Sequence, residues 1–243
     1  MTDARPLRTF GRTKARTLKP RQAALVETLL PHLAVPEVGA MDVDSLFSAP
    51  SSASVGASPH PPTPSPSRGG GVALEIGFGG GEHLVAQAAA HPEARFIGVE
   101  PFLNGVASCL RHIEDSGVSN VRLNMGDARD VVARLPEVSL DLCYILFPDP
   151  WPKARHHKRR LIQPEFLDAL ARVLSPGAEV RFATDWANYA EWTLEHFTRD
   201  PRFTWTAERA EDWRKAWPGH VTTRYEQKRL GDCAPVWLRF VRS

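Results

Sequence analysis

Residues 74–84 read LEIGFGGGEHL, an apolar run that leads into four glycines within five residues. Glycine has no Cβ, so such a run lets the backbone turn tightly and lets a ligand approach it closely. A helical pattern follows over residues 82–91. This arrangement is typical of the first strand-turn-helix unit of a nucleotide-binding α/β sheet.

The sequence around this turn continues the same alternation. Apolar runs that predict strands occupy residues 72–76, 95–100, 121–125, 140–147 and 179–184. Helical patterns lie at residues 82–91, 102–116, 128–135 and 163–174. Residues 234–242 alternate in polarity and predict an antiparallel strand at the sheet's edge. The predicted fold class is α/β, a doubly wound, mostly parallel sheet with helices on both faces.

The glycine turn could serve two kinds of ligand. A dinucleotide fingerprint requires glycine at position 82, where this sequence has Glu82. The pattern E-x-G-x-G-x-G fits Glu75, Gly77, Gly79 and Gly81. A carboxylate beside the turn would repel a pyrophosphate but suits a cationic ligand. The turn therefore favours S-adenosylmethionine, which carries an ammonium and a sulfonium, over the NAD of an oxidoreductase.

Acidic residues also follow the next two predicted strands. Glu100 ends the second strand, where a carboxylate can bind the two hydroxyls of a ribose. Asp127 follows the third strand, where its carboxylate or a neighbouring amide can reach an adenine. Either residue alone could be an ordinary turn residue, because Asp and Gly are common in turns. Together with Glu75 they favour a nucleoside-binding site.

The fourth predicted strand leads into residues 146–162, LFPDPWPKARHHKRRLI. Prolines on both sides of Asp149 hold its carboxylate on a rigid loop beside the predicted donor. Trp151 could stack on a base, and the five Lys and Arg of residues 153–160 could hold phosphates. The plainer alternatives are a turn role for Asp149 and a packing role for Trp151.

Positive charge is concentrated in two places, although the formal net charge is only +2. Residues 1–21 contain seven Lys or Arg and one Asp, and residues 153–160 contain five Lys or Arg and no acid. Two separated basic clusters on a mildly acidic body favour a polyanionic partner. The alternative is a disordered basic tail and a solvated loop.

Composition narrows the class of protein further. Hydrophobic residues make up 42% of the chain and charged residues 24%, as is typical of globular proteins. No stretch approaches the roughly 20 apolar residues of a membrane-spanning helix, and the basic N-terminus lacks the apolar core of a secretory signal. Cys109, Cys143 and Cys233 have no metal-ligand spacing and argue against a disulfide framework. We expect a soluble, cytoplasmic monomer without a metal site or a membrane partner.

One segment differs in kind from the rest of the chain. Residues 48–71 contain six Pro, seven Ser and four Gly without an acid, which predicts a flexible insertion. A short amphipathic helix is expected before it, over residues 21–35. The predicted domains are a basic arm with this helix (1–47), the insertion (48–71) and the α/β domain (72–243).

Five stretches, in this order, resemble the bacterial tRNA guanine-N7 methyltransferase family: LEIGFGGGEHL, GVEP, FPDPWPKARHHKRRL, FATDWANYAEW and TRYEQK. The resemblance covers residues 72–243, and residues 8–16 are similar to the family's basic arm. It implies a Rossmann-like, seven-stranded methyltransferase sheet that uses S-adenosylmethionine. The implied reaction methylates N7 of a guanine in the tRNA variable loop (guanosine 46). The insertion and Pro152 depart from the family pattern.

The resemblance also implies roles for individual residues. The cofactor-binding residues would be the glycine turn together with Glu75, Glu100, Asp127 and Asp149. Asp149 would also be the catalytic residue. The substrate-binding residues would be Lys153, Asp185, Thr223, Arg224, Tyr225 and Glu226. Plainer alternatives stay open, with Asp185 as a helix N-cap, Lys153 as a solvated cation and residues 223–226 as a polar edge strand.

The implied chemistry is an SN2 methyl transfer. Guanine N7 has an available lone pair, so no general base is required. We expect catalysis from alignment and from a carboxylate field, with Asp149 accepting hydrogen bonds from guanine N1–H and N2–H₂. Trp151 and Tyr225 are candidate platforms for a base that leaves its stack. Two alternatives are a methyltransferase acting on an exocyclic amine of a base and a non-catalytic RNA-binding protein on the same scaffold.

Overall fold

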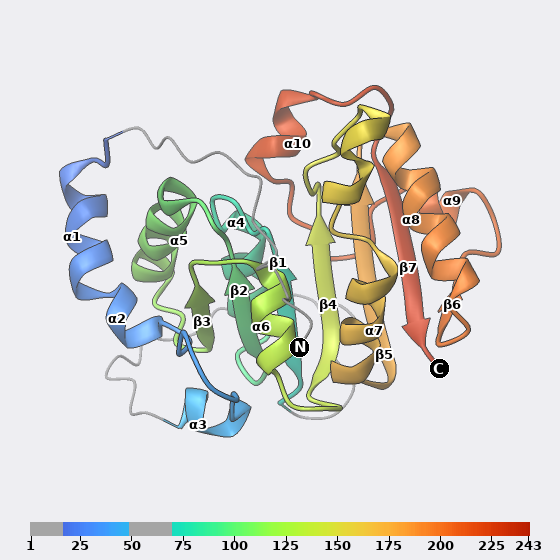
Figure 1. Cartoon of the computed structure of the whole chain (residues 1–243). Coiled ribbons are helices and arrows are strands. Elements are labelled where there is room, and N and C mark those ends of the chain that lie inside the picture. The colour runs from blue at the N-terminus through green and yellow to red at the C-terminus, as the bar shows by residue number, and fades with distance from the viewer. Residues whose placement is uncertain (1–16, 49–69) are drawn as a thin grey trace.

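The computed structural model describes residues 17–48 and 70–243 (Figure 1). The predicted basic stretch at residues 8–16 lies outside the described residues, as does most of the predicted insertion. The division of the chain into arm, insertion and α/β domain therefore stays a prediction.

The described residues form a seven-stranded sheet in the order β3-β2-β1-β4-β5-β7-β6. The strands are β1 (Val72–Ile76), β2 (Arg95–Val99), β3 (Val121–Asn124), β4 (Leu140–Leu146), β5 (Leu174–Thr184), β6 (Phe203–Trp205) and β7 (Val236–Arg242). β1 to β5 pair in parallel, and β7 is antiparallel to both β5 and β6. This confirms the predicted mostly parallel α/β sheet. The prediction that residues 234–242 form the edge strand is wrong, because the short β6 pairs on the outer side of β7.

The strand order reverses between β1 and β4. β2 and β3 extend from β1 in one direction, whereas β4 and β5 extend in the other. Ligands of open α/β sheets bind beyond the carboxyl ends of the strands at such a switch point. The glycine turn follows β1 and the Asp149 loop follows β4, so both lie at this point, at the upper edge of the sheet in Figure 1.

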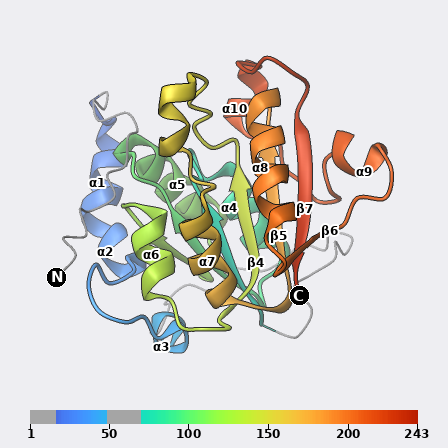
Figure 2. The same ribbon diagram turned by 45° about the vertical axis from the view of Figure 1, so that its right-hand side comes forward.

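Helices cover both faces of the sheet, as predicted (Figure 2). Successive strand residues point to opposite faces, so Leu74 joins one core and Ala73 the other. The core that contains Ala73 packs against α1 (Pro20–Thr28), α2 (Leu30–Leu33), α4 (Glu82–Ala90) and α5 (Leu103–Ser116). The core that contains Leu74 packs against α3 (Val43–Phe47), α6 (Ala128–Arg134), α7 (Pro164–Val173) and α8 (Ala187–Arg199).

Several helices differ from the sequence prediction. The single helix expected over residues 21–35 is divided into α1 and α2, because Pro31 cannot donate a hydrogen bond within a continuous helix. We did not predict α3, α8, α9 (Glu211–Arg214), α10 (Arg224–Lys228) or the 3₁₀ helix η1 (Ala154–Arg159). The start of α8 depends on a distant residue, since the carboxylate of Asp232 accepts a hydrogen bond from Ala187 N at 2.8 Å. Among the described helices, none is both long and apolar enough to cross a membrane.

Candidate functional site

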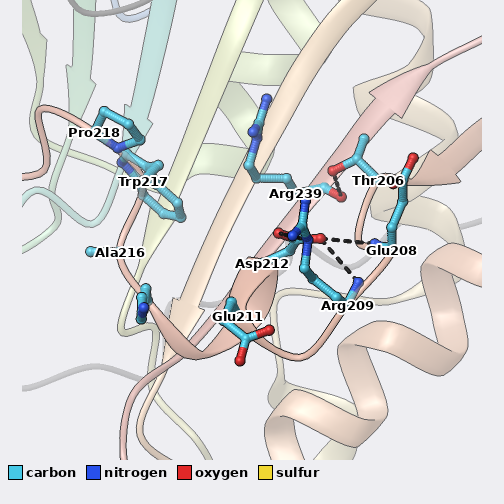
Figure 3. Close-up of a pocket in the computed structure, with 10 residues that line it drawn as sticks. Thr206, Glu208, Arg209, Glu211, Asp212, Ala216, Trp217, Pro218 and Arg239 are labelled. Carbon is cyan, nitrogen blue, oxygen red and sulfur yellow. Dashed lines mark hydrogen bonds and ion pairs between the residues drawn. The ribbon is translucent and has the colours of Figure 1, made fainter.

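A pocket beside β7 and α9 does not contain the predicted site (Figure 3). It has a volume of about 390 Å³ and is lined by acidic and basic side chains. Within it, Asp212 accepts hydrogen bonds from Glu208 N and Arg209 N, which lower the pKa of Asp212. None of the residues predicted to bind cofactor or substrate lines this pocket.

The glycine turn after β1 leaves an open space in front of its backbone. Gly77 and Gly79 have φ angles of +72° and +56°, and a Cβ placed at either would meet nothing within 4 Å. Gly81 is different, because a Cβ there would lie 2.5 Å from Cys109 on α5. Gly77 and Gly79 therefore form a surface that a ligand can approach, whereas Gly81 allows α4 and α5 to pack closely.

Glu100, directly after β2, holds the glycine turn in place. Its two carboxylate oxygens accept hydrogen bonds from Gly79 N and Phe102 N, both at 2.9 Å. Burial raises the pKa of Glu100; these hydrogen bonds oppose the increase, and the negative charge of Asp149 adds to it. The charge of Asp149 therefore acts on Glu100, and the cofactor-binding role of both residues stays a prediction.

Glu75 lies within β1 rather than at the open edge. Its side chain is 1% exposed, and Oε2 lies 2.7 Å from His83 Nδ1 on α4. One carboxylate oxygen is therefore already used inside the protein. This pairing was not predicted from the sequence.

Asp127 is the N-cap of α6. Its Oδ1 accepts a hydrogen bond from Arg129 N at 2.9 Å, and its carboxylate forms an ion pair with the Arg129 guanidinium at 3.2 Å. The turn role that the sequence left open is therefore present. A contact with a bound nucleoside would come from the remaining lone pairs or from the neighbouring backbone amides.

The loop after β4 holds Asp149 between two residues with unusual backbone angles. Phe147 and Trp151 have φ angles of +51° and +44°, which non-glycine residues rarely adopt. Phe147 N donates a hydrogen bond to Ala183 O at 2.7 Å, and the Phe147 ring lies 5.5 Å from that of Tyr225. Such conformations persist only where surrounding contacts hold them, and they are concentrated at functional sites.

Arg160 supports this loop from behind. The sequence grouped it with the phosphate-binding cations of residues 153–160, but Arg160 is only 1% exposed. Its Nε donates to Pro150 O at 2.9 Å, and Nη2 donates to Asn188 Oδ1 at 2.7 Å. Its guanidinium also lies over the Tyr189 ring, 4.7 Å from the centroid. The prediction that Arg160 holds phosphate is therefore wrong.

The rest of this basic run lies nearer the surface. Lys153, Arg155 and Lys158 are exposed, and η1 contains the last two of them. The Arg159 guanidinium lies 5.0 Å from the centre of the Trp151 ring. Trp151 is half-buried, so the loop combines an aromatic surface with exposed cations.

Asp185, at the end of β5, holds the C-terminal segment. Its Oδ2 accepts a hydrogen bond from Gly231 N at 2.9 Å, and Oδ1 lies 3.5 Å from Tyr225 OH. The N-cap residue of α8 is Trp186, and its side chain makes no capping hydrogen bond. The alternative that Asp185 is an N-cap is therefore wrong.

Residues 223–226 begin a helix rather than an edge strand. Thr223 and Glu226 form a capping box, in which each side chain accepts a hydrogen bond from the other's backbone N–H. Burial raises the pKa of Tyr225, and the charges of Asp185 and Asp149 add to the increase. Tyr225 therefore lies beside Asp185, and the charge of Asp149 also acts on it.

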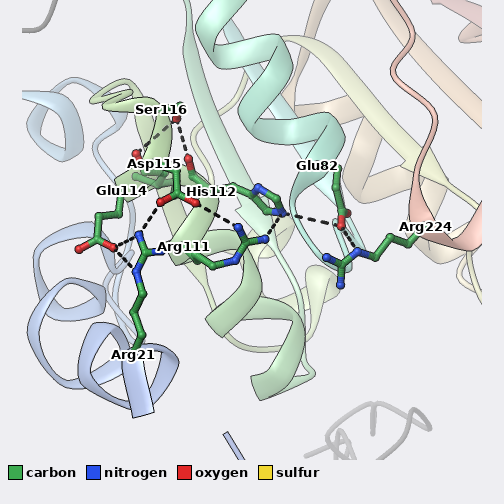
Figure 4. Close-up of polar contacts among 9 residues, drawn as sticks. Arg21, Glu82, Arg111, His112, Glu114, Asp115, Ser116 and Arg224 are labelled. Atoms are coloured by element: carbon green, nitrogen blue, oxygen red, sulfur yellow. Dashed lines mark hydrogen bonds and ion pairs between the residues drawn. The ribbon is translucent and has the colours of Figure 1, made fainter. Parts of the chain in front are cut away.

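Arg224 links α10 to the helix that follows the glycine turn (Figure 4). Its Nε lies 2.8 Å from Glu82 Oε1 on α4, and His112 Nε2 on α5 lies 3.8 Å from the same oxygen. At the far end of the polar contacts drawn in Figure 4, Arg21 of α1 pairs with Glu114 and Asp115 of α5. The predicted substrate segment is thus attached to the cofactor side of the sheet.

Sequence reasoning missed the residues that support this site from within. His83 and His220 each contact a carboxylate, at 2.7 Å from Glu75 and 2.9 Å from Glu226. The position of His83 eight residues after Glu75 gave no signal, because the contact requires α4 to fold back on β1. Across residues 17–48 and 70–243, no group of three or more His, Cys, Asp or Glu side chains could hold a metal ion.

Comparisons with known proteins agree with this fold. A family model described as a putative methyltransferase matches residues 70–237. The solved structure of TrmN from Thermus thermophilus superposes with a TM-score of 0.51 at 17% identity, over 73% of this chain and 45% of that chain. The reversing sheet, the glycine turn and the strand-end acids thus define an α/β methyltransferase.

Closer relatives identify the family within this class. The tRNA (guanine-N(7)-)-methyltransferase of Caulobacter vibrioides (strain NA1000 / CB15N) is 55% identical over 239 residues, which cover 98% of this chain and 96% of that protein. The protein of the same name from Rhodopseudomonas palustris (strain BisB5) is 49% identical, over 96% of this chain and 85% of that protein. The chain belongs to the tRNA (guanine-N(7)-)-methyltransferase family, which confirms the resemblance found in the motifs.

Proposed function

We propose that this protein transfers a methyl group from S-adenosylmethionine to N7 of a guanine in the variable loop of tRNA, guanosine 46, and forms 7-methylguanosine. The observation that carries the proposal is the placement of Asp149. Asp149 follows β4, which lies in the sheet between β1, with its glycine turn, and β5, which is followed by Asp185 beside Tyr225. A carboxylate between the two sides can act on both reactants.

The chain's residues suit S-adenosylmethionine at the carboxyl edge. The space in front of Gly77 and Gly79 admits a ligand against the backbone. Glu100 would accept hydrogen bonds from the ribose hydroxyls, and the amides beside Asp127 would contact the adenine. His83 holds one carboxylate oxygen of Glu75, and the other oxygen would bind the ligand's ammonium. When bound, S-adenosylmethionine supplies an electrophilic methyl group on a sulfonium.

In the reaction, the N7 lone pair of guanine forms the new N–C bond while the C–S bond breaks and its electron pair remains on sulfur. The purine becomes cationic, and no proton leaves. Asp149 would orient the guanine through its N1–H and N2–H₂ groups and would favour the developing positive charge. Lys153, Asp185 and residues 223–226 would hold the nucleotide around it.

The tRNA backbone would bind the exposed cations of η1 and the N-terminal basic stretch. Such contacts release counterions and make the affinity depend on salt. The half-buried Trp151 lies beside them and would be the platform on which a displaced base stacks. The monomeric state and the cytoplasmic location that we predicted from the sequence belong to the same proposal.

The experiment that tests this function is mass spectrometry of nucleosides. The purified protein would be incubated with S-adenosylmethionine and unmodified tRNA, and the RNA then digested. We expect 7-methylguanosine as the new product, absent when the guanine of the variable loop is replaced by adenine. A different methylated nucleoside would contradict the acceptor proposal. No methylated product, with S-adenosylhomocysteine binding confirmed, would favour a non-catalytic RNA-binding protein.

Gly105→Ala is expected to weaken S-adenosylhomocysteine binding by tenfold or more. Alanine is the better helix former by about 1 kcal/mol, so α5 itself gains stability. However, a Cβ at residue 105 would lie 2.4 Å from Gly79 O and would displace the glycine turn. Isothermal titration calorimetry measures the effect, with Ser108→Ala on the same helix as the control. Unchanged affinity would show that the turn does not contact the ligand.

The affinity for S-adenosylhomocysteine is expected to fall as the pH is lowered from about 7 to about 5. The ionised form of Glu100 is the better acceptor for the ribose hydroxyls. Because burial raises the pKa of Glu100 above the usual value of 4.5, protonation begins at a higher pH than for an exposed Glu. The Glu100→Gln protein should bind more weakly and show a flat profile over this range. An unchanged profile in that variant would assign the pH dependence to another group.

A further inference from the structure

Three side chains of α4 contact the segment that precedes and begins α10. Glu82 Oε1 lies 2.8 Å from Arg224 Nε, and Gln87 Nε2 donates to Gly219 O at 2.7 Å. Between these two contacts, the ring of His83 lies 5.4 Å from the ring of His220. Since α4 begins directly after the glycine turn, one helix touches both the proposed donor side and the proposed acceptor segment.

His220 connects this helix with the capping box of α10. Its Nε2 lies 2.9 Å from Glu226 Oε2, and the same oxygen accepts a hydrogen bond from Thr223 N at 2.8 Å. The two side chains are 5% and 9% exposed. Burial alone would raise the pKa of Glu226, but the hydrogen bonds from His220 and Thr223 lower it below its usual value. Glu226 is therefore an ionised acceptor whose position depends on His220.

Aromatic rings hold His220 in place on the sheet. Its ring centre lies 4.5 Å from that of Trp237 on β7 and 5.8 Å from that of Trp217. Trp217 and Trp237 also contact each other edge to face at 5.0 Å. Both tryptophans are buried in the core that contains Ala73. The imidazole is thus fixed from the sheet side and from α4, and its contact with Glu226 transmits that position to residues 223–226.

We propose that His220 is a positioning residue for the acceptor nucleotide. His220 orients Glu226 and the start of α10. The contact between His220 and His83 on α4 fixes the distance of His220 from the glycine turn. This inference rests on the proposed function, because the acceptor segment is taken to contact the guanine nucleotide. It adds a residue that no motif indicated and assigns to α4 a role in aligning the two reactants.

The proposal predicts which binding constant changes. Removing the imidazole frees Glu226 within a capping box that still has its backbone bonds, so the segment stays helical but is less well oriented. We expect His220→Ala to lower kcat/KM for tRNA and the tRNA affinity by about tenfold each. The affinity for S-adenosylhomocysteine should change less than twofold, because the turn and Glu100 are untouched.

Four variants make the test decisive. His220→Gln keeps a hydrogen-bond donor for Glu226. The logarithm of its tRNA affinity should therefore fall by no more than half as much as in His220→Ala. Gln87→Ala removes the contact with Gly219 O but leaves His220 in place, and it should cause a part of the same loss of tRNA affinity. This variant tests the proposal even if the His220→Ala protein fails to fold. In a double-mutant cycle, His220→Ala and Glu226→Gln should be non-additive by threefold or more. His196→Ala on α8 is the matched control and should be additive with Glu226→Gln.

The outcome of each of these measurements supports or overturns the positioning role of His220. Equal losses of tRNA and S-adenosylhomocysteine affinity, no recovery in His220→Gln, or additivity with Glu226→Gln would each overturn the positioning role. The tRNA affinity is measured directly by filter binding, so the inference is judged independently of turnover. If the unaltered protein bound tRNA but formed no 7-methylguanosine, the proposed function would fail while the same binding comparison still judged His220.

Discussion

Asp149→Ala is expected to reduce kcat by about 10²–10³-fold, the range seen when a preorganised group that stabilises a transition state is removed. The carboxylate would lose both the hydrogen bonds that orient the guanine and the charge that favours the cationic product. Single-turnover formation of 7-methylguanosine measures the effect on the chemical step. The Kd for S-adenosylhomocysteine should rise no more than about threefold, because Glu100 and the glycine turn remain.

Asp149→Asn separates the two contributions of the carboxylate. The amide oxygen can still accept a hydrogen bond, but the negative charge is lost, so a smaller reduction of about 10–100-fold is expected. Asp168→Ala, which removes an exposed acid on α7, is the control for net charge. Undiminished turnover in Asp149→Ala would rule out its catalytic role, whereas equal losses in the Ala and Asn proteins would assign the effect to charge alone.

The second large effect is expected for Arg160→Ala. The substitution leaves Pro150 O and the Asn188 amide without their buried partner and removes the packing against Tyr189. We expect a loss of about 2–4 kcal/mol in unfolding free energy, or about 5–12 °C in Tm. Because Pro150 follows Asp149 directly, kcat should fall as well, by tenfold or more.

Lys158→Ala, two residues earlier in the same basic run, should behave in the opposite way. Its side chain is exposed, so Tm should stay within about 2 °C. The tRNA affinity should weaken, and the slope of log affinity against log salt should become less steep by about one unit. Thermal unfolding and filter binding over a salt series distinguish the two variants. If Arg160→Ala changed the salt dependence of tRNA affinity and Lys158→Ala did not, the structural role of Arg160 and the phosphate-binding role of Lys158 would both be contradicted.

The different roles of Lys158 and Arg160 could not be predicted from the sequence. Lys158 and Arg160 have the same charge and belong to the same motif, and composition treats them alike. The side chain of Arg160 turns inward only because α8 brings Asn188, Tyr189 and Trp192 beside it. Those partners lie about 30 positions away along the chain, and no local pattern encodes the contact.

The sequence alone determined the parallel α/β sheet, the glycine turn, and the positions of Glu100, Asp127, Asp149 and Asp185 after successive strands. These features follow from local periodicity and from the rule that parallel strands end at one edge, so they can be derived without coordinates. The tertiary structure alone decided which charges turn inward, that Glu75 pairs with His83, and that His220 contacts the capping box of residues 223–226. Burial and hydrogen-bond partners depend on segments that only the folded chain brings together, and these contacts set the positions of the side chains at the site.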